Sequence, residues 1–195
     1  QCSPGTTLHW TILGASTFNG KVTTAGLHVT GNNFRLQDCS LRGPTVAAYV
    51  AGQNLVEVEG ASTTSRLSGL TVLHSEFSDI GSSGLIGNFV DYVLIEHSYF
   101  HNIGYIGFGC LSCNDGKVLY NRFKTIMPGT SGNNTYGMTL THESTLYNLD
   151  PNAGTKQAVH PYCSNWLVSG NETEDISWIG LDAHGCYECT FVMNH

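Results

Sequence analysis

The apolar and polar positions of this chain recur with a period of 23 residues. Phe77, Phe100 and Phe123 are spaced by that period, and each lies in a similar stretch of sequence. The positions five and seven residues before each Phe are mostly β-branched or Leu. Because these positions are two apart, they face the same side of a strand. A repeat this short and this rich in strand-forming residues predicts a solenoid in which each repeat is one coil.

A polar column accompanies the apolar ones, two residues before the Phe position. This position is an odd number of residues after the inward apolar positions, so its side chain could not also point inward along a straight strand. We therefore expect the chain to bend there. Ser and Asn suit a bend because their side chains bond to the backbone and, about 4.8 Å apart on stacked coils, to each other. The members of this column are Cys39, Ser75, Ser98, Asn121, Asn171 and Asn194. The apolar column five residues before the Phe contains Leu36, Val72, Ile95, Val118, Val168 and Phe191.

These columns predict an all-β fold, a parallel β-helix with about 23 residues, three short strands and three turns per coil. We expect residues 1–195 to form a single domain. The sequence stops in the middle of a repeat, so we expect either a longer helix or an end that another subunit covers.

The inward run of Ser75, Ser98, Asn121, Asn171 and Asn194, together with the aliphatic and Phe stacks, resembles the asparagine ladder of the pectate-lyase-like superfamily. The resemblance extends over roughly residues 27–195. It implies a right-handed parallel β-helix. It also implies a substrate groove for polysaccharide along one parallel sheet, between protruding loops.

Composition narrows the function classes. Charged residues make up 12% of the chain, and the net charge is −7 with only eight Lys and Arg. A nucleic-acid partner is therefore not expected, because neutralising phosphates needs a basic face. No apolar run approaches the length of a membrane span. The start at Gln1-Cys2 is typical of a mature chain after signal-peptide removal, so we expect a secreted, extracellular protein.

The seven cysteines admit two interpretations. Cys113, Cys163 and Cys186 stand ten residues before the Phe position in successive coils, within disulfide reach, and we expect Cys163 to bond to Cys113 or Cys186. Cys39 is expected to be free and buried. The alternative is zinc, because Cys110-x-x-Cys113 and Cys186-x-x-Cys189 resemble zinc knuckles that Cys163 or His184 would complete. Apart from this alternative, no metal or cofactor is expected.

Two glycosylation sequons begin at Asn133 and Asn171. Asn133 lies in an insertion rich in Gly, Ser and Asn, where an N-glycan is expected. Asn171 belongs to the inward polar column, where a glycan has no room.

Two insertions interrupt the period, at residues 127–135 and 142–162, and they flank a strand expected at 136–141. Long loops on a rigid solenoid are where binding residues gather. On this strand Thr139 and Thr141 should point outward, and one coil later so should Asp182 and His184. His160 and Tyr162, from the second insertion, are expected to join the two threonines in binding substrate.

The same face holds the candidate catalytic residues. Asp182 with His142 or His184 would form an acid–base pair. Asp182 with Glu143 would provide the two carboxylates that glycoside hydrolysis needs.

Two functions follow from these features. The first is a secreted β-helix protein that binds or processes polysaccharide, and as an enzyme it would be a polysaccharide lyase or a glycoside hydrolase. The alternative is a non-catalytic structural β-helix, a filament, coat or adhesin subunit that assembles end to end through its uncapped coils.

Overall fold

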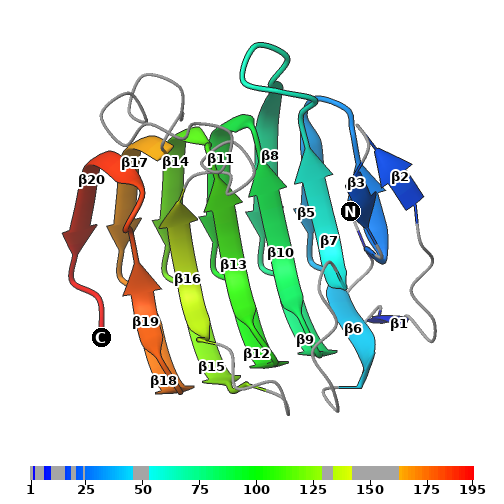
Figure 1. Ribbon diagram of the computed structural model, residues 1–195. Coiled ribbons are helices and arrows are strands. Elements are labelled where there is room, and N and C mark those ends of the chain that lie inside the picture. Colours follow the sequence, from blue (N-terminus) through cyan, green and yellow to red (C-terminus); the bar gives the residue numbers. More distant parts are fainter. Residues whose placement is uncertain are drawn as a thin grey trace.

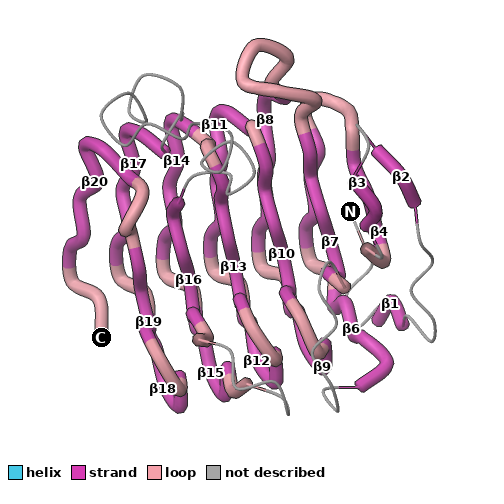
Figure 2. The backbone as a smooth tube through the Cα atoms, in the orientation of Figure 1, coloured by secondary structure: helices cyan, strands magenta, loops and turns pink. Residues whose placement is uncertain are grey.

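The computed structural model describes residues 2, 7–9, 16–18, 21–23, 25–45, 53–128, 134–141 and 163–195, and the chain folds as a right-handed parallel β-helix (Figure 1). Three six-stranded parallel sheets run along the helix, and each coil passes through all three in turn (Figure 2). The expected fold class is confirmed. No helix among these residues is long and apolar enough to cross a membrane.

We name the sheets in the order in which a coil visits them. Sheet 1 contains β4 (Leu27–Val29), β7 (Asn54–Glu59), β10 (Ser83–Asn88), β13 (Ile106–Leu111), β16 (Tyr136–Thr141) and β19 (Ile179–Asp182). Sheet 2 contains β5 (Phe34–Gln37), β8 (Leu67–Leu73), β11 (Val90–Glu96), β14 (Asn114–Leu119), β17 (Cys163–Ser169) and β20 (Cys186–Val192). Sheet 3 contains β1 (Thr7–His9), β6 (Ser40–Thr45), β9 (Glu76–Ile80), β12 (Tyr99–Ile103), β15 (Arg122–Ile126) and β18 (Glu172–Ile176). A separate antiparallel pair joins β2 (Ser16–Phe18) and β3 (Lys21–Thr23).

The apolar columns form the core of the helix. Phe77 pairs with Phe100, and Phe100 with Phe123, on neighbouring strands of sheet 3. Their rings stack with centroids 4.7 and 5.1 Å apart, and all three side chains are fully buried. The 23-residue period therefore matches the register of the strands in the sheets. A shift of one strand by one residue relative to its neighbour would turn its ring toward solvent.

The polar column lies at the corner between sheets 2 and 3, inside the helix. The Asn121 side-chain oxygen accepts a hydrogen bond from the Ser98 backbone N–H at 2.9 Å. Asn171 does the same for Asn121, and Asn194 for Asn171, each at 2.9 Å. Ser75 and Ser98 continue the ladder with their hydroxyl oxygens. Asn171 is fully buried, as its inward position requires, whereas Asn133 lies outside the described residues.

The corners between sheets 2 and 3 also contain residues with a left-handed backbone. At the corner before the Asn ladder these residues include His74, His97 and Tyr120, with φ of 47°, 49° and 54°. Left-handed φ is uncommon for residues other than Gly, so the stacked coils hold it in place. The rings of His74 and His97 stack at 5.3 Å, and those of His97 and Tyr120 at the same distance. The sequence pattern does not reveal which residue of a corner turns left-handed.

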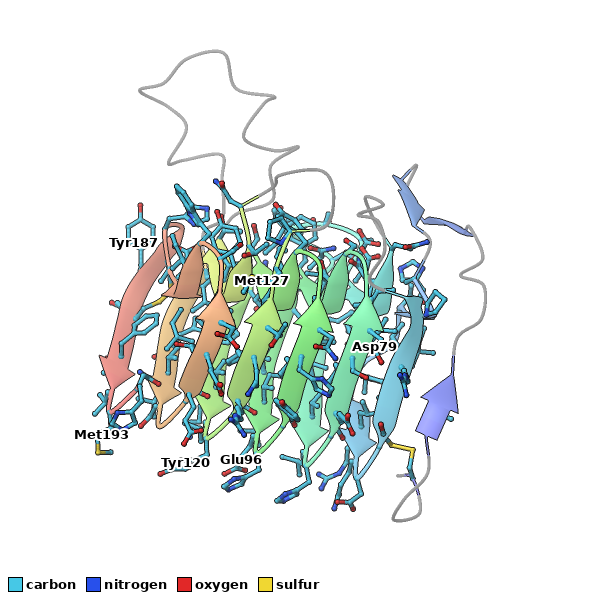
Figure 3. The ribbon with its side chains drawn as sticks, turned by 90° about the horizontal axis from the view of Figure 1, so that it is seen from below. Asp79, Glu96, Tyr120, Met127, Tyr187 and Met193 are labelled. Atoms are coloured by element: carbon cyan, nitrogen blue, oxygen red, sulfur yellow. A yellow bond between two sulfur atoms is a disulfide. The ribbon has the colours of Figure 1, made fainter. Side chains whose placement is uncertain are left out.

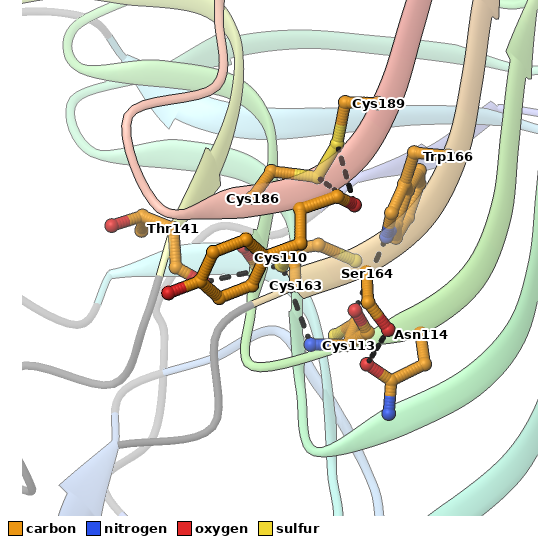
Figure 4. The surroundings of a disulfide bond; sticks show 10 residues. Cys110, Cys113, Asn114, Thr141, Cys163, Ser164, Trp166, Cys186 and Cys189 are labelled. Carbon is orange, nitrogen blue, oxygen red and sulfur yellow. Dashed lines mark hydrogen bonds between the residues drawn. A yellow bond between two sulfur atoms is a disulfide. The ribbon is translucent and has the colours of Figure 1, made fainter. Parts of the chain in front are cut away.

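The disulfides differ from those expected. Cys2 bonds to Cys39, and Cys186 bonds to Cys189 within one strand (Figure 4). The expectations of a free Cys39 and of a crosslink from Cys163 to Cys113 or Cys186 were therefore wrong.

Three cysteines, Cys110, Cys113 and Cys163, are free and buried. The sulfur of Cys163 bonds to backbone groups of the neighbouring coil, 3.3 Å from the Cys110 carbonyl oxygen and 3.4 Å from the Cys113 backbone nitrogen. Cys163 Sγ donates to the Thr141 carbonyl at 3.1 Å, and Cys113 Sγ donates to the Gly87 carbonyl at 3.4 Å. The 23-residue period correctly placed Cys113 and Cys163 on adjacent coils, but it did not determine the direction of their side chains.

The three free thiols should be unreactive in the folded protein. Burial raises the pKa of Cys110 and of Cys163, so little thiolate forms near neutral pH, and thiolate is the nucleophile. We expect iodoacetamide to leave Cys110, Cys113 and Cys163 unmodified in native protein and to modify all three after unfolding, as measured by mass spectrometry. A crosslink at any of them in a non-reducing peptide map would contradict this pairing.

The Asn ladder should contribute measurably to the free energy of unfolding. Replacing Asn121→Ala removes the acceptor of the Ser98 N–H and the donor to the Ile95 carbonyl, both buried, and should cost about 3 kcal/mol in urea unfolding. Asn114→Ala is the matched control, because the half-buried Asn114 side chain bonds to the Asp91 and Ser164 side chains on the outer surface. Equal losses in the two variants would show that the ladder adds nothing beyond an ordinary surface amide.

Candidate functional site

The outward face of sheet 1 holds a linked set of polar side chains. Met138 and Leu140 on β16 are fully buried in the core, so Thr139 and Thr141 between and after them face outward. On the next strand Thr139 pairs with Asp182. The alternation in the sequence therefore assigned the faces of β16 and β19 correctly.

Asp182 is the centre of this set. Its Oδ2 accepts a hydrogen bond from the Thr139 hydroxyl at 2.6 Å and contacts His184 Nδ1 at 2.5 Å. On the far side of the imidazole, His184 Nε2 lies 2.9 Å from the Thr141 hydroxyl. The Asp182 side chain is 10% exposed and that of His184 is 53% exposed. A buried carboxylate thus orients an accessible imidazole, which is the arrangement that suits a general base.

Two tyrosines border the imidazole. The Tyr136 ring centre lies 6.4 Å from that of His184, and Tyr105 meets Tyr136 edge-on at 6.3 Å. Burial raises the pKa of Tyr136, and the negative charge of Asp182 raises it further. The phenol therefore stays protonated at neutral pH and has a proton to donate.

A second acidic group on the same face was missed in the sequence. Glu57 on β7 lies in the register row that continues through Ile86 and Gly109 to Thr139 and Asp182. Its carboxylate accepts hydrogen bonds at 3.2 Å from the side-chain amides of Asn54 and Asn88, and all three residues are buried.

Glu59, two residues further on β7, contacts His28 at 3.2 Å. Glu57 and Glu59 alternate with the inward Val56 and Val58, and this alternation was a signal of outward carboxylates. The coil was overlooked because residues 46–53 interrupt the 23-residue spacing before it.

Several expected site residues lie outside the described residues. These are His142, Glu143, His160 and Tyr162. Of the expected set, the structure brings together Thr139, Thr141, Asp182 and His184.

The zinc alternative lacks a set of ligands in the described part of the chain. Within those ranges no group of three or more His, Cys, Asp and Glu side chains is placed to hold a metal ion. Cys186 and Cys189, half of the thiols in the two knuckle motifs, are joined to each other.

The outward face of sheet 3 carries ion pairs. Glu76 contacts His101 Nε2 at 2.8 Å, and Glu174 bonds to both Arg122 and Lys124 at 2.8 Å. These cations lower the pKa of Glu174. The pairs are exposed, so each adds little to stability. The Glu76–His101 pair also provides a carboxylate–imidazole contact, and the Tyr99 ring stacks on this imidazole with centroids 4.3 Å apart.

Comparison with known proteins adds one structural likeness. No protein-family model matches the chain, and no curated protein sequence matches it. The A-module of mannuronan C-5 epimerase AlgE6 from Azotobacter vinelandii aligns with 13% sequence identity and a TM-score of 0.47. The alignment covers 88% of this chain and 48% of that chain, so this chain spans about half of its length.

Asp182 should contribute to stability as well as to the site. Although it lies on an outward face, it is nearly buried and has two hydrogen-bonded partners. We expect Asp182→Ala to lower the free energy of unfolding by about 1–3 kcal/mol, because Thr139 loses its acceptor. Glu174→Ala, which removes an exposed carboxylate from sheet 3, should cause a smaller change in the same urea titration. A larger loss for Glu174→Ala would contradict this assignment.

Proposed function

We propose that the outward face of sheet 1 binds polysaccharide and that His184, oriented by Asp182, transfers a proton on the bound chain. The observation that carries the proposal is the linked row Thr139–Asp182–His184–Thr141 beside Tyr136. The resemblance of the Ser and Asn ladder to the pectate-lyase-like superfamily supports a polysaccharide as the substrate.

Among the described residues the geometry favours elimination over hydrolysis. Asp182 is engaged by Thr139 and His184, so it is not free to act as one of the two carboxylates that flank a glycosidic bond in hydrolysis. His184 Nε2, once Thr141 turns toward the substrate, is free to accept a proton. We therefore propose a polysaccharide lyase in preference to a glycoside hydrolase.

The proposed step is a β-elimination on a uronate unit. His184 Nε2 takes the proton from the carbon next to the sugar carboxyl group, and that electron pair forms the carbon–carbon double bond. The glycosidic carbon–oxygen bond at the β position breaks, and its oxygen takes the proton of the Tyr136 phenol. Asp182 stabilises the imidazolium that results.

We also propose that the protein is secreted. Its support is the pair of disulfides, Cys2–Cys39 and Cys186–Cys189, because disulfides persist mainly in oxidising compartments.

The decisive test removes the imidazole. Purified protein should release unsaturated uronate products, detected by ultraviolet absorbance, from polygalacturonate or alginate. His184→Ala and Tyr136→Phe should each lower kcat at least 100-fold, the typical contribution of a general acid or base. His101→Ala is the matched control, since it disrupts a carboxylate–imidazole contact on sheet 3, and its kcat should equal that of the unaltered protein.

Three results would contradict the proposal. One is turnover that survives His184→Ala. Another is equal loss of activity in His101→Ala. The third is no turnover of either polysaccharide together with end-to-end assembly of the purified protein, which would favour the structural β-helix.

A further inference from the structure

A pocket of about 360 Å³ lies on the outward face of sheet 2, away from the sheet 1 site. Strands β11, β14, β17 and β20 each contribute to it. Its volume is within the range of small-molecule sites, about 300–1,000 Å³. The residues on which its chemistry depends are Tyr92, Asp115, Gly116, Lys117, Asn165 and Glu188.

The backbone shapes one wall of the pocket. Tyr92, Asp115, Asn165 and Glu188 occupy the same position in successive coils, and their φ angles are 59°, 56°, 58° and 53°. At each of them the ladder skips a residue, for example between the pairs Asp91–Asn114 and Val93–Gly116. The left-handed residue in each strand turns its side chain outward, so the four side chains form a row.

The floor of the pocket is rigid. A Cβ on Gly116 would lie 2.3 Å from atoms of the Trp166 ring, so only glycine fits beneath that indole. The ring is in turn fixed by its Nε1–H, which donates to the Cys113 carbonyl at 3.1 Å, and Trp166 is 2% exposed. A ligand would thus meet a preformed surface.

Charged groups in the pocket are left without partners. Neither Lys117 nor Glu188 forms a side-chain hydrogen bond or an ion pair with another residue that the structure describes. Asp115 receives one hydrogen bond, from the Asn165 amide at 2.6 Å. The neighbouring outward row differs, because Arg66, Asp91, Asn114 and Ser164 bond to one another in sequence. The ammonium group of Lys117 and the carboxylate of Glu188 are therefore open to a ligand at the pocket.

The mixture of groups indicates what the pocket would bind. Asp115 and Glu188 outnumber Lys117, so an anionic ligand would be repelled. Sugar hydroxyl groups both donate and accept, and so they match two carboxylates, one amide and one ammonium group. Tyr92, with 65% of its surface exposed, offers an aromatic face to the apolar side of a sugar ring.

We propose that this pocket binds a neutral sugar unit of a glycan chain. It is a second glycan site on a different sheet from the proposed catalytic face, and it does not depend on turnover there. Through it the protein would hold a neutral glycan while sheet 1 acts on an acidic one.

Isothermal titration calorimetry with cellohexaose, maltohexaose and β-1,4-mannohexaose tests the pocket. At least one of these neutral hexaoses should bind. Tyr92→Ala and Lys117→Ala should each weaken that affinity at least tenfold. Tyr120→Ala is the matched control, because Tyr120 is similarly exposed and projects from the coil corner between sheets 2 and 3 (Figure 3), and its affinity should be unchanged. Asp182→Asn should also bind normally, which separates this pocket from the sheet 1 site.

The proposal is overturned if none of the three neutral hexaoses binds, or if oligouronates bind at the pocket in their place. It is equally overturned if Tyr120→Ala weakens binding as much as Tyr92→Ala. Loss of binding in Asp182→Asn alone would move the neutral glycan to sheet 1. Circular dichroism of each variant, which should match that of the unaltered protein, establishes that a lost affinity reflects the pocket.

Discussion

The corner between sheets 2 and 3 must turn inside the protein without leaving backbone groups unbonded, and the ladder of Ser and Asn side chains meets that requirement. At each coil the side chain accepts from the backbone N–H of the preceding coil, and Asn121 and Asn171 also donate to buried carbonyls. An unpaired buried backbone group costs about 1–3 kcal/mol, so the corner is tolerable only when every coil presents a suitable side chain at the same position. This constraint holds successive coils in one register.

Once the register is fixed, residues far apart in the sequence become neighbours across a sheet. Thr139 and Asp182 are separated by a 43-residue interval, yet they pair on adjacent strands and share a hydrogen bond. The same stacking brings His184 beside Thr141. A β-helix therefore builds a site from single side chains on successive coils, with the rigid core setting their spacing. The Asp182 carboxylate becomes nearly buried because its neighbours on both strands surround it.

The outward faces of the three sheets differ in how their charges are satisfied. On sheet 3 exposed carboxylates pair with His101, Arg122 and Lys124. On sheet 1 a carboxylate and an imidazole are joined in a row with two hydroxyl groups, beside a phenol that remains protonated. On sheet 2, Lys117 and Glu188 form no ion pair with another described residue, and they lie around a rigid floor. The scaffold thus separates a face with a proton-transfer geometry from a face with an open polar pocket.

The sequence alone determined the parallel β-helix, the register, the inward Asn ladder and the outward phase of Thr139, Thr141, Asp182 and His184. All of these follow from one period, because the side-chain direction along a strand alternates and each coil stacks on the next. The period carries no information on which way a side chain turns within its column. The pairing of Cys39 with Cys2, the free thiol of Cys163 and the burial of Asp182 were therefore decided by contacts in the folded chain. Glu57 was not predicted because an insertion interrupts the 23-residue period before its coil. The sheet 2 pocket was not predicted because it depends on residues with left-handed φ and on the fit of Trp166 over Gly116, and both arise only when the coils pack.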